Sequence, residues 1–98
     1  MLRLLVVTEN SMAPAYEEGD FVLVGKIPFL FSVTAGDVVV LRRQPYGTLI
    51  KRVQATSPNG QFVTVLGTHP NSVDSRTFGP VGLHEIVGKV LWHVKRRP

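Results

Sequence analysis

The sequence predicts an all-β domain, a small partly closed barrel or sandwich of short antiparallel strands. Short apolar runs rich in Val, Leu and Phe recur along the chain, and clusters of Gly, Pro, Asn, Asp and Ser separate them. No stretch carries the 3.6-residue apolar stripe of an amphipathic helix. Because 98 residues suffice for one domain and leave little room for a second, we expect residues 1–98 to form a single unit.

Three strands are expected in the N-terminal half. Leu2–Val7 is the first, because it is an apolar and partly β-branched run. Phe21–Val24 is the second and begins after the turn residues of Glu17–Asp20. The third, Val38–Leu41, begins after the Ala-Gly-Asp turn at Ala35–Asp37.

Three more strands are expected in the C-terminal half. Thr48–Val53 and Gln61–Leu66 form a hairpin, because the Ser-Pro-Asn-Gly sequence of Ser57–Gly60 between them favours a tight turn. Glu85–Val94 is the closing strand, and Gly88 within it predicts a β-bulge.

The formal net charge is +4, from 11 Lys and Arg against 7 Asp and Glu, and such a charge suits an anionic partner. The basic residues are clustered, however, and Lys95–Arg97 form a tail of the kind that is usually solvated. We therefore expect no nucleic-acid partner. The absence of cysteine excludes disulfides and thiol catalysis, and the histidines lack the spacing of metal ligands. No metal and no cofactor is expected.

No apolar run approaches the roughly 20 residues that a membrane-spanning helix needs. The N-terminus also lacks the length and the cleavage site of a secretory signal, so we expect a cytoplasmic protein. The apolar segment Ile27–Val33 is too short to span a membrane. It offers a peripheral contact with a membrane surface, or it packs in the core or against a partner.

Ser11 is a candidate nucleophile. It lies on the polar loop Thr8–Pro14, just before a turn whose proline can hold a side chain exposed and rigid. Taken alone, Ser11 is more readily an ordinary loop serine.

Lys51 is a candidate general base because it lies inside an apolar strand. Alternation along a strand places Leu49, Lys51 and Val53 on one face and Ile50 with Arg52 on the other. If the first face is the core, burial disfavours the charged ammonium and leaves a neutral amine that can accept a proton. If the strand lies at a sheet edge, Lys51 points into solvent. The residues alone leave both possibilities open.

The polar stretch Gly67–Gly82 is the third candidate region, because a loop this long in a small domain is usually functional or disordered. Its Asn71–Gly79 part is dense in hydrogen-bonding side chains. Asp74 and Arg76 are spaced to form an ion pair, and Ser72 is placed to hydrogen-bond a lysine amine. On its own, this segment is more readily a polar surface loop.

Together and in this order, the candidate regions resemble the signal peptidase I family. The family's motifs are Ser-Met-x-Pro, two Gly-Asp strands, a strand ending in Lys-Arg, an Asn-Ser-x-Asp-Ser-Arg box and a closing Ile-Val-Gly-Lys. They correspond here to Ser11–Pro14, Gly19–Val24, Gly36–Val40, Ile50–Val53, Asn71–Gly79 and Ile86–Lys89. The similarity runs from about Val6 to Val90. One motif would be weak evidence, but several in order are specific.

The resemblance implies a Ser-Lys dyad on an all-β fold shared with repressor autoproteases. Ser11 would attack the scissile carbonyl, and neutral Lys51 would take its proton and pass it to the leaving amine. Ser72 would orient the Lys51 amine, while Asp74 and Arg76 would support the loop. A protein or peptide precursor would bind as an extended strand beside a sheet edge.

Three features depart from the family's pattern. Gly67–His69 stands where Gly-Asp-Asn is usual, and Glu9 stands two residues before the nucleophile, where Ser or Gly is usual. The oxyanion hole would therefore use the Ser11 backbone N–H with Asn10 as a replacement donor. The membrane anchor and large second domain of bacterial signal peptidases are also missing. In size the chain resembles the compact nickel-type superoxide dismutase maturation proteases, which implies removal of an N-terminal leader from a soluble precursor.

Other classes of function stay open at this point. The altered Gly67–His69 stretch is compatible with a fold that has lost activity and serves as a binding module. A small basic nucleic-acid-binding barrel would need exposed aromatic residues interleaved with Lys and Arg, whereas the aromatic residues here are spread along the chain. Repressor autoproteases would need a DNA-binding domain, and no helix-turn-helix pattern precedes Ser11, so we rank them lower.

Overall fold

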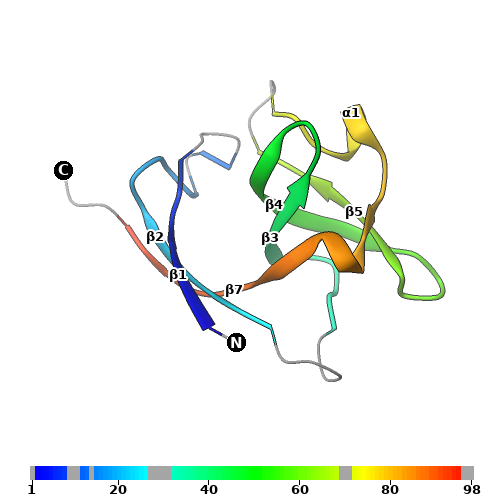
Figure 1. The fold of residues 1–98 in the computed structure, drawn as a ribbon, viewed down its shortest axis with the longest axis horizontal. Helices are drawn as coiled ribbons and strands as arrows, with labels where there is room; N and C mark the ends of the chain where they lie inside the picture. The colour runs from blue at the N-terminus through cyan, green and yellow to red at the C-terminus, as the bar shows by residue number, and fades with distance from the viewer. Residues whose placement is uncertain (1, 9–11, 14, 27–31, 69–71, 96–98) are drawn as a thin grey trace.

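The computed structural model describes residues 2–8, 12–13, 15–26, 32–68 and 72–95, which form a seven-stranded antiparallel sheet (Figure 1). The strands are β1 (Leu2–Val6), β2 (Phe21–Gly25), β3 (Val38–Arg43), β4 (Gly47–Thr56), β5 (Phe62–Leu66), β6 (Val81–Gly82) and β7 (Ile86–Val94). Their order across the sheet is β1-β2-β7-β3-β4-β5-β6. The all-β prediction is confirmed. The sheet is open within the described residues, because its end strands β1 and β6 do not pair with each other.

All six expected strands are present, with small shifts at their ends. The hairpin turn between β4 and β5 is also confirmed. Within it, the Asn59 side-chain oxygen accepts hydrogen bonds from the Ser57 hydroxyl at 2.7 Å and from the Gln61 backbone N–H at 3.0 Å. Gly60 adopts a φ of 72°, a backbone conformation that favours glycine. These contacts fix the turn at the residues that predicted it.

A β-bulge lies beside Gly88, as expected. The pairing of β3 with β7 shifts between Val40↔Gly88 and Leu41↔Ile86, so Val87 is the extra residue. Gly88 itself permits a close approach of β2, since a Cβ atom there would lie 2.7 Å from the carbonyl oxygen of Gly25.

The polar stretch after β5 holds more structure than a loop. It contains the one-turn helix α1 (Ser75–Phe78) and the short strand β6, and a 3-10 turn, η1 (Leu83–Glu85), follows it. Asp74 caps the start of α1, and Gly79 with a φ of 81° ends it. A single turn is too short to show an apolar period, so the pattern could not predict it.

Two apolar clusters cover opposite faces of the sheet. The first cluster consists of Val33, Val39, Leu41, Leu49, Val53, Val63, Val65, Val81 and Ile86. The second cluster consists of Val7, Met12, Val22, Val24, Val38, Val40 and Ile50. Because side chains alternate along a strand, β3 supplies both clusters and is buried on both faces. This explains why β3 is a continuous apolar run instead of an alternating one.

The sheet has two halves in Figure 1: β1, β2 and the end of β7 lie in one half, and β4, β5 and α1 lie in the other. In the part of the chain that the structure describes, no helix has the length and apolar character needed to cross a membrane.

Candidate active site

Lys51 is fully buried in β4. Its exposed fraction is 0%, and its neighbours on the same face, Leu49 and Val53, are 6% and 2% exposed. Ile50 packs on the opposite face, in the second cluster. The alternation predicted from the sequence is confirmed, and the solvent-facing alternative is wrong. Burial removes the amine from bulk water, which penalises its charged form.

The predicted nucleophile Ser11 and the predicted oxyanion donor Asn10 lie outside the described residues. The chain on both sides of them is held in the core. Val7 precedes them with an exposed fraction of 4%, and Met12 follows with 0%. Both side chains belong to the second cluster, which also contains Ile50, the residue before Lys51. The segments that flank Ser11 therefore meet the lysine strand in one apolar cluster.

The loop before β2 fastens the end of β1. The Val7 backbone N–H donates to the Asp20 carbonyl, and Gly19 N–H donates to the Val7 carbonyl, each at 2.8 Å. The Asp20 carboxylate, which is nearly fully buried, lies 2.7 Å from His93 Nε2. The Tyr16 ring stacks on the His93 ring with centroids 4.2 Å apart, and burial raises the pKa of the Tyr16 phenol. Gly19 and Asp20, the first Gly-Asp motif, thus have a structural role in holding the chain that leads into the candidate nucleophile loop.

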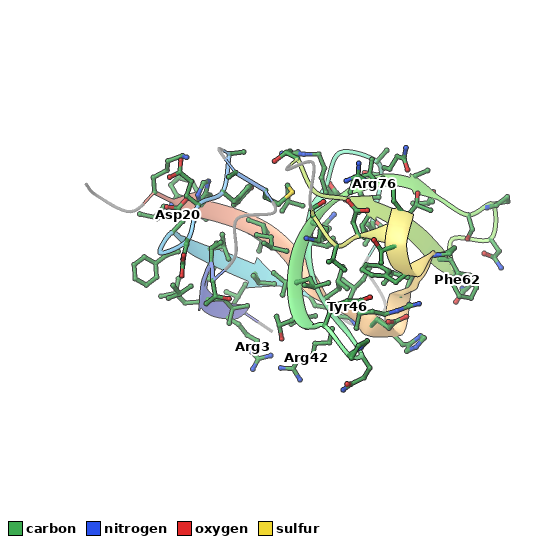
Figure 2. The ribbon with its side chains drawn as sticks, turned by 90° about the horizontal axis from the view of Figure 1, so that it is seen from above. Arg3, Asp20, Arg42, Tyr46, Phe62 and Arg76 are labelled. Atoms are coloured by element: carbon green, nitrogen blue, oxygen red, sulfur yellow. The ribbon has the colours of Figure 1, made fainter. Side chains whose placement is uncertain are left out.

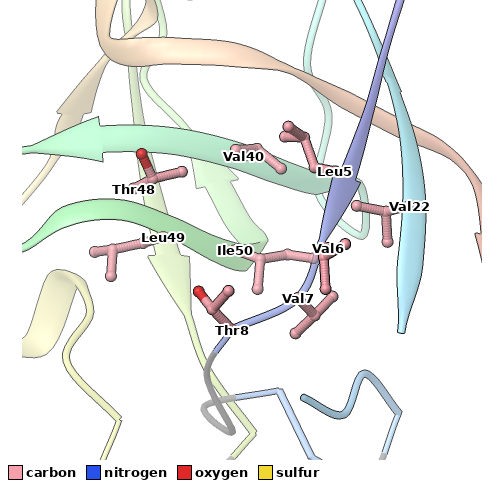
Figure 3. A pocket seen from close by; sticks show the side chains of 9 residues that line it. All are labelled: Leu5, Val6, Val7, Thr8, Val22, Val40, Thr48, Leu49 and Ile50. Carbon is pink, nitrogen blue, oxygen red and sulfur yellow. The ribbon is translucent and has the colours of Figure 1, made fainter. Parts of the chain in front are cut away.

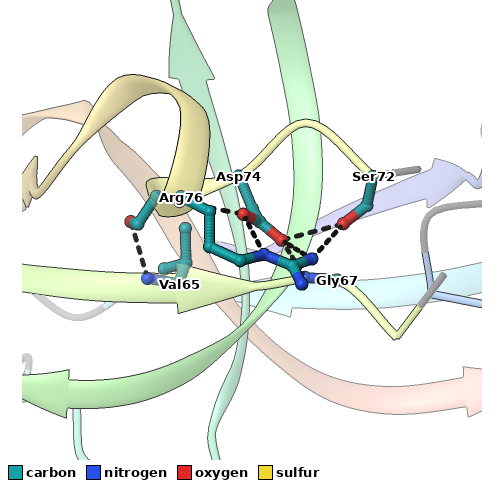
Figure 4. Close-up of polar contacts among 6 residues, drawn as sticks. Val65, Gly67, Ser72, Asp74 and Arg76 are labelled. Atoms are coloured by element: carbon teal, nitrogen blue, oxygen red, sulfur yellow. Dashed lines mark hydrogen bonds and ion pairs between the residues drawn. The ribbon is translucent and has the colours of Figure 1, made fainter. Parts of the chain in front are cut away.

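Asp74 is the centre of the polar network in Figure 4. Its buried carboxylate accepts five hydrogen bonds. Oδ1 accepts from the backbone N–H and the Nε of Arg76, both at 3.0 Å. Oδ2 accepts from Arg76 Nη2 at 2.7 Å, Ser72 Oγ at 2.8 Å and Gly67 N–H at 2.9 Å. The ion pair expected between Asp74 and Arg76 is present.

The hydrogen bonds decide the charge of Asp74. Burial alone would raise the pKa of this carboxyl, but the bonds from Arg76, Gly67 and Ser72 outweigh burial and hold the pKa well below its usual range. The same contacts raise the pKa of Arg76. Asp74 is therefore a charged anchor under all ordinary conditions.

We expect this anchor to fail in acid. Because the folded-state pKa of Asp74 is lowered, its contribution to stability is full above the unfolded-state pKa of about 3.9 and is lost as the pH falls further. The difference in melting temperature between wild type and Asp74→Asn should therefore shrink from about pH 6 to about pH 2. Thermal unfolding followed by circular dichroism measures it. A difference that stays constant or grows in acid would contradict the assignment.

Ser72 contacts the network directly. Its hydroxyl donates to Asp74 Oδ2 and accepts from Arg76 Nη2 at 3.1 Å. A hydroxyl has one proton and two lone pairs, so one lone pair is left by these two contacts and suits an amine donor. The orienting role of Ser72 toward Lys51 stays a prediction.

Thr68 joins the network to the candidate nucleophile loop, and the sequence did not indicate it. Its Oγ1 donates to the Ala13 carbonyl at 2.6 Å, while the preceding Gly67 N–H is held by Asp74. His69 lies outside the described residues. No local pattern marks a threonine that bonds a carbonyl 55 residues away in the chain. The altered Gly-Thr-His stretch therefore bridges two of the candidate regions.

Ser75 is a second residue that the sequence reasoning missed. Its Oγ accepts from the Val65 backbone N–H at 2.8 Å and so fastens α1 to β5. The signal was available in the Asn-Ser-x-Asp-Ser-Arg box, where Ser75 directly follows the capping residue Asp74.

A small pocket lies between the end of β1 and the start of β4 (Figure 3). Its lining is apolar except for two threonines, and consists of Leu5, Val6, Val7, Thr8, Val22, Val40, Thr48, Leu49 and Ile50. β1 is the edge of the sheet, and β4 pairs with β5 only from Arg52 onward. The pocket thus separates the strand that leads into the candidate nucleophile loop from the strand that contains Lys51. Among the described residues, no cluster of His, Asp and Glu is placed to hold a metal.

The geometry therefore combines a buried lysine, two flanks of the candidate nucleophile loop that pack with the lysine strand, and a buried carboxylate that holds the third region. No individual curated protein matches the chain. The model of the family described as Peptidase S24-like matches residues 1–91, nearly the whole chain. The chain belongs to the Peptidase S24-like family of serine peptidases.

Proposed function

We propose that this protein is a serine endopeptidase that cleaves an N-terminal leader or signal-like extension from a protein precursor with a Ser-Lys dyad. The observation that carries the proposal is the complete burial of Lys51 in β4 of a peptidase-family chain. A fully buried lysine is costly for stability, and a neutral amine is what a general base requires.

In the proposed reaction, Ser11 Oγ attacks the scissile carbonyl carbon while the Lys51 amine takes the hydroxyl proton. The Ser11 backbone N–H and the Asn10 side chain stabilise the oxyanion. The lysine then passes the proton to the leaving amine, which departs and leaves an acyl-enzyme. A water molecule, deprotonated by the Lys51 amine, then hydrolyses the acyl-enzyme ester and restores Ser11.

The substrate would bind as an extended strand in the pocket between β1 and β4. Backbone groups of the edge strand β1 and of the Thr48–Leu49 segment are suited to pair with an added strand. The narrow apolar lining favours small side chains near the scissile bond.

At the finer level, we propose a signal-peptidase-like enzyme of the compact kind that matures nickel-type superoxide dismutase, acting in the cytoplasm. The motifs from Ser11 to Lys89 support the signal-peptidase-like type of enzyme. A peripheral membrane contact through Ile27–Val33 stays a further proposal. Residues 27–31 lie outside the described residues, and Val33 packs in the first cluster.

The test is cleavage of a peptide library with small residues at the scissile position, and of an intact precursor, by wild type, Ser11→Ala and Lys51→Ala. Cleavage by wild type alone supports the dyad. Equal cleavage by all three would defeat it and indicate a contaminant. No cleavage by any of them would favour a binding module. Mass spectrometry of the enzyme itself distinguishes cleavage of a substrate from self-cleavage.

Replacing Thr68 with Val should lower kcat by about tenfold with little change in KM. The substitution removes the hydrogen bond to the Ala13 carbonyl but preserves the shape of the side chain. Steady-state kinetics on the best library peptide measure the effect, and Thr68→Ser, which keeps the donor, should retain most of the rate. If Thr68→Val and Thr68→Ser had the same kcat, and this kcat differed from that of wild type, the hydrogen bond from Thr68 to the Ala13 carbonyl would not position the loop.

A further inference from the structure

His93 lies near the end of β7, directly opposite Val22 of β2. Its side chain is mostly buried, with an exposed fraction of 20%. Because residues directly opposite in neighbouring strands share a face, His93 points to the side of the sheet that carries Val22 and the rest of the second cluster. It lies beyond the last family motif, which ends at Lys89, so the resemblance gives this histidine no role.

The first contact of His93 is with a buried carboxylate. Its Nε2 lies 2.7 Å from Asp20 Oδ2, and the Asp20 side chain is 3% exposed. A carboxylate only accepts hydrogen bonds, so the imidazole is the donor in this contact. The same oxygen accepts the Glu17 backbone N–H at 3.0 Å. Because a buried carboxylate depends on such donors, His93 fixes where Asp20 lies.

Asp20 passes this constraint to the chain before Ser11. Its backbone carbonyl accepts from the Val7 N–H, and the Gly19 N–H donates to the Val7 carbonyl, each at 2.8 Å. These two hydrogen bonds close a loop that begins at Val7, ends at Gly19 and includes the candidate nucleophile. A displacement of Asp20 would therefore move the base of that loop.

The second contact of His93 reaches the chain after Ser11. The Tyr16 ring stacks on the His93 ring, with centroids 4.2 Å apart and an angle of 21° between the planes. The Tyr16 backbone N–H donates to the Met12 carbonyl at 2.9 Å. Met12 directly follows Ser11 and is completely buried. One imidazole thus constrains the loop on both sides of the candidate nucleophile.

These contacts are separate from the polar network of Figure 4. In Figure 2, Asp20 and Arg76 lie in different halves of the molecule. The network reaches the loop at another point, where Thr68 bonds the Ala13 carbonyl. The loop is therefore fastened from two sides, and loss of the His93 contacts should loosen it without disturbing the network.

We propose that His93 is a positioning residue of the serine peptidase, which holds the candidate nucleophile loop in place through Asp20 and Tyr16. The inference rests on the proposed function, because the position of Ser11 affects a rate only if Ser11 attacks a substrate. A misplacement of about 1 Å can lower a rate roughly 100-fold. The effect falls on the attack and not on substrate binding, so it belongs to kcat and not to KM.

His93→Phe and His93→Gln separate the two contacts. Phenylalanine keeps a ring for Tyr16 but has no donor for Asp20, whereas glutamine keeps a donor and lacks the ring. With the best library peptide, kcat should fall about tenfold in His93→Phe and by a smaller factor in His93→Gln, with KM nearly unchanged. Urea unfolding of each variant allows rates to be compared per folded molecule. His84→Phe is the matched control, because it changes an exposed histidine of η1 and should keep the wild-type kcat.

Hydrogen exchange followed by NMR measures the hold on the loop without a substrate. The backbone N–H groups of Val7, Gly19 and Tyr16 are hydrogen-bonded within the loop. In His93→Phe, which removes the donor to Asp20, the Val7 and Gly19 amides should exchange on the order of tenfold faster than in wild type. In His93→Gln, which removes the ring, the Tyr16 amide should show the increase instead. The amides of β3 should not change in either variant.

The two readouts keep this inference apart from the proposed function. If wild type cleaves no peptide, the proposed function fails, and the exchange rates still decide whether His93 holds the loop. Unchanged exchange at all three amides, or a wild-type kcat in both His93 variants, would overturn the proposal. If His93→Phe does not fold, His93→Gln gives the decision alone, because it retains a donor for Asp20.

Discussion

Replacing Lys51 with Met should abolish peptide cleavage while leaving the protein as stable as wild type or more stable. The lysine is completely buried beside Leu49 and Val53. Methionine has a similar length and fills the same space without an amine that must be desolvated. Loss of a general base typically lowers the rate by about 10²–10⁴-fold.

The opposite signs of the two effects make this result informative. If Lys51 stabilised the fold, its replacement would destabilise the protein. If Lys51 serves catalysis, its replacement lowers the rate of cleavage without destabilising the protein. Library-peptide cleavage and urea unfolding on the same preparation measure both. Arg52→Met is the matched control, because Arg52 is the next residue of β4 and is exposed on the opposite face. If Lys51→Met cleaved the peptides at the wild-type rate, Lys51 would not be the general base.

Asp74→Asn should destabilise the protein by about 2–3 kcal/mol, since hydrogen bonds to a charged group each count for more than neutral ones. The carboxylate is fully buried and serves Arg76, Ser72 and Gly67 at once. An amide keeps the shape but loses the charge and presents an NH₂ group to donors. Arg76 is half-exposed and regains some water, which keeps the cost below that of a fully buried pair.

Urea unfolding measures this loss, and Asp37→Asn is the control. Asp37 also caps a turn and pairs with a lysine, but its side chain is partly exposed. Its replacement should cost less than about 1 kcal/mol. If the two variants lost the same free energy of unfolding, the burial of Asp74 would not contribute to the stability of the protein. We also expect Asp74→Asn to lose activity, because Gly67 connects this carboxylate through Thr68 to the loop after Ser11.

Much of the fold followed from local pattern. Apolar runs and turn residues predicted all six long strands, because each strand is bounded by Gly, Pro or Asx turns whose chemistry is local. The alternation around Lys51 predicted its face but not its burial. That depended on residues distant in the chain, such as Val33 and Val81, which join the first cluster on the same face of the sheet and are brought there only by long-range packing.

The links between the candidate regions could not be predicted. Thr68 and Ala13 are far apart in the chain, and their hydrogen bond depends on how the sheet curls. The exposure of one face of β1 and β2 could not be predicted either, because Leu2–Val7 and Phe21–Val24 have the same composition whether one or both faces are covered.

The burial of β3 on both faces has a consequence for unfolding. Its alternate residues belong to the two apolar clusters, so both clusters are built on the same strand. Neither cluster can loosen without exposing side chains of the other, and we expect the protein to melt in one cooperative transition. Lys51 lies on the face of the first cluster and the neighbours of Ser11 lie in the second. Enzyme activity would therefore report the integrity of both clusters.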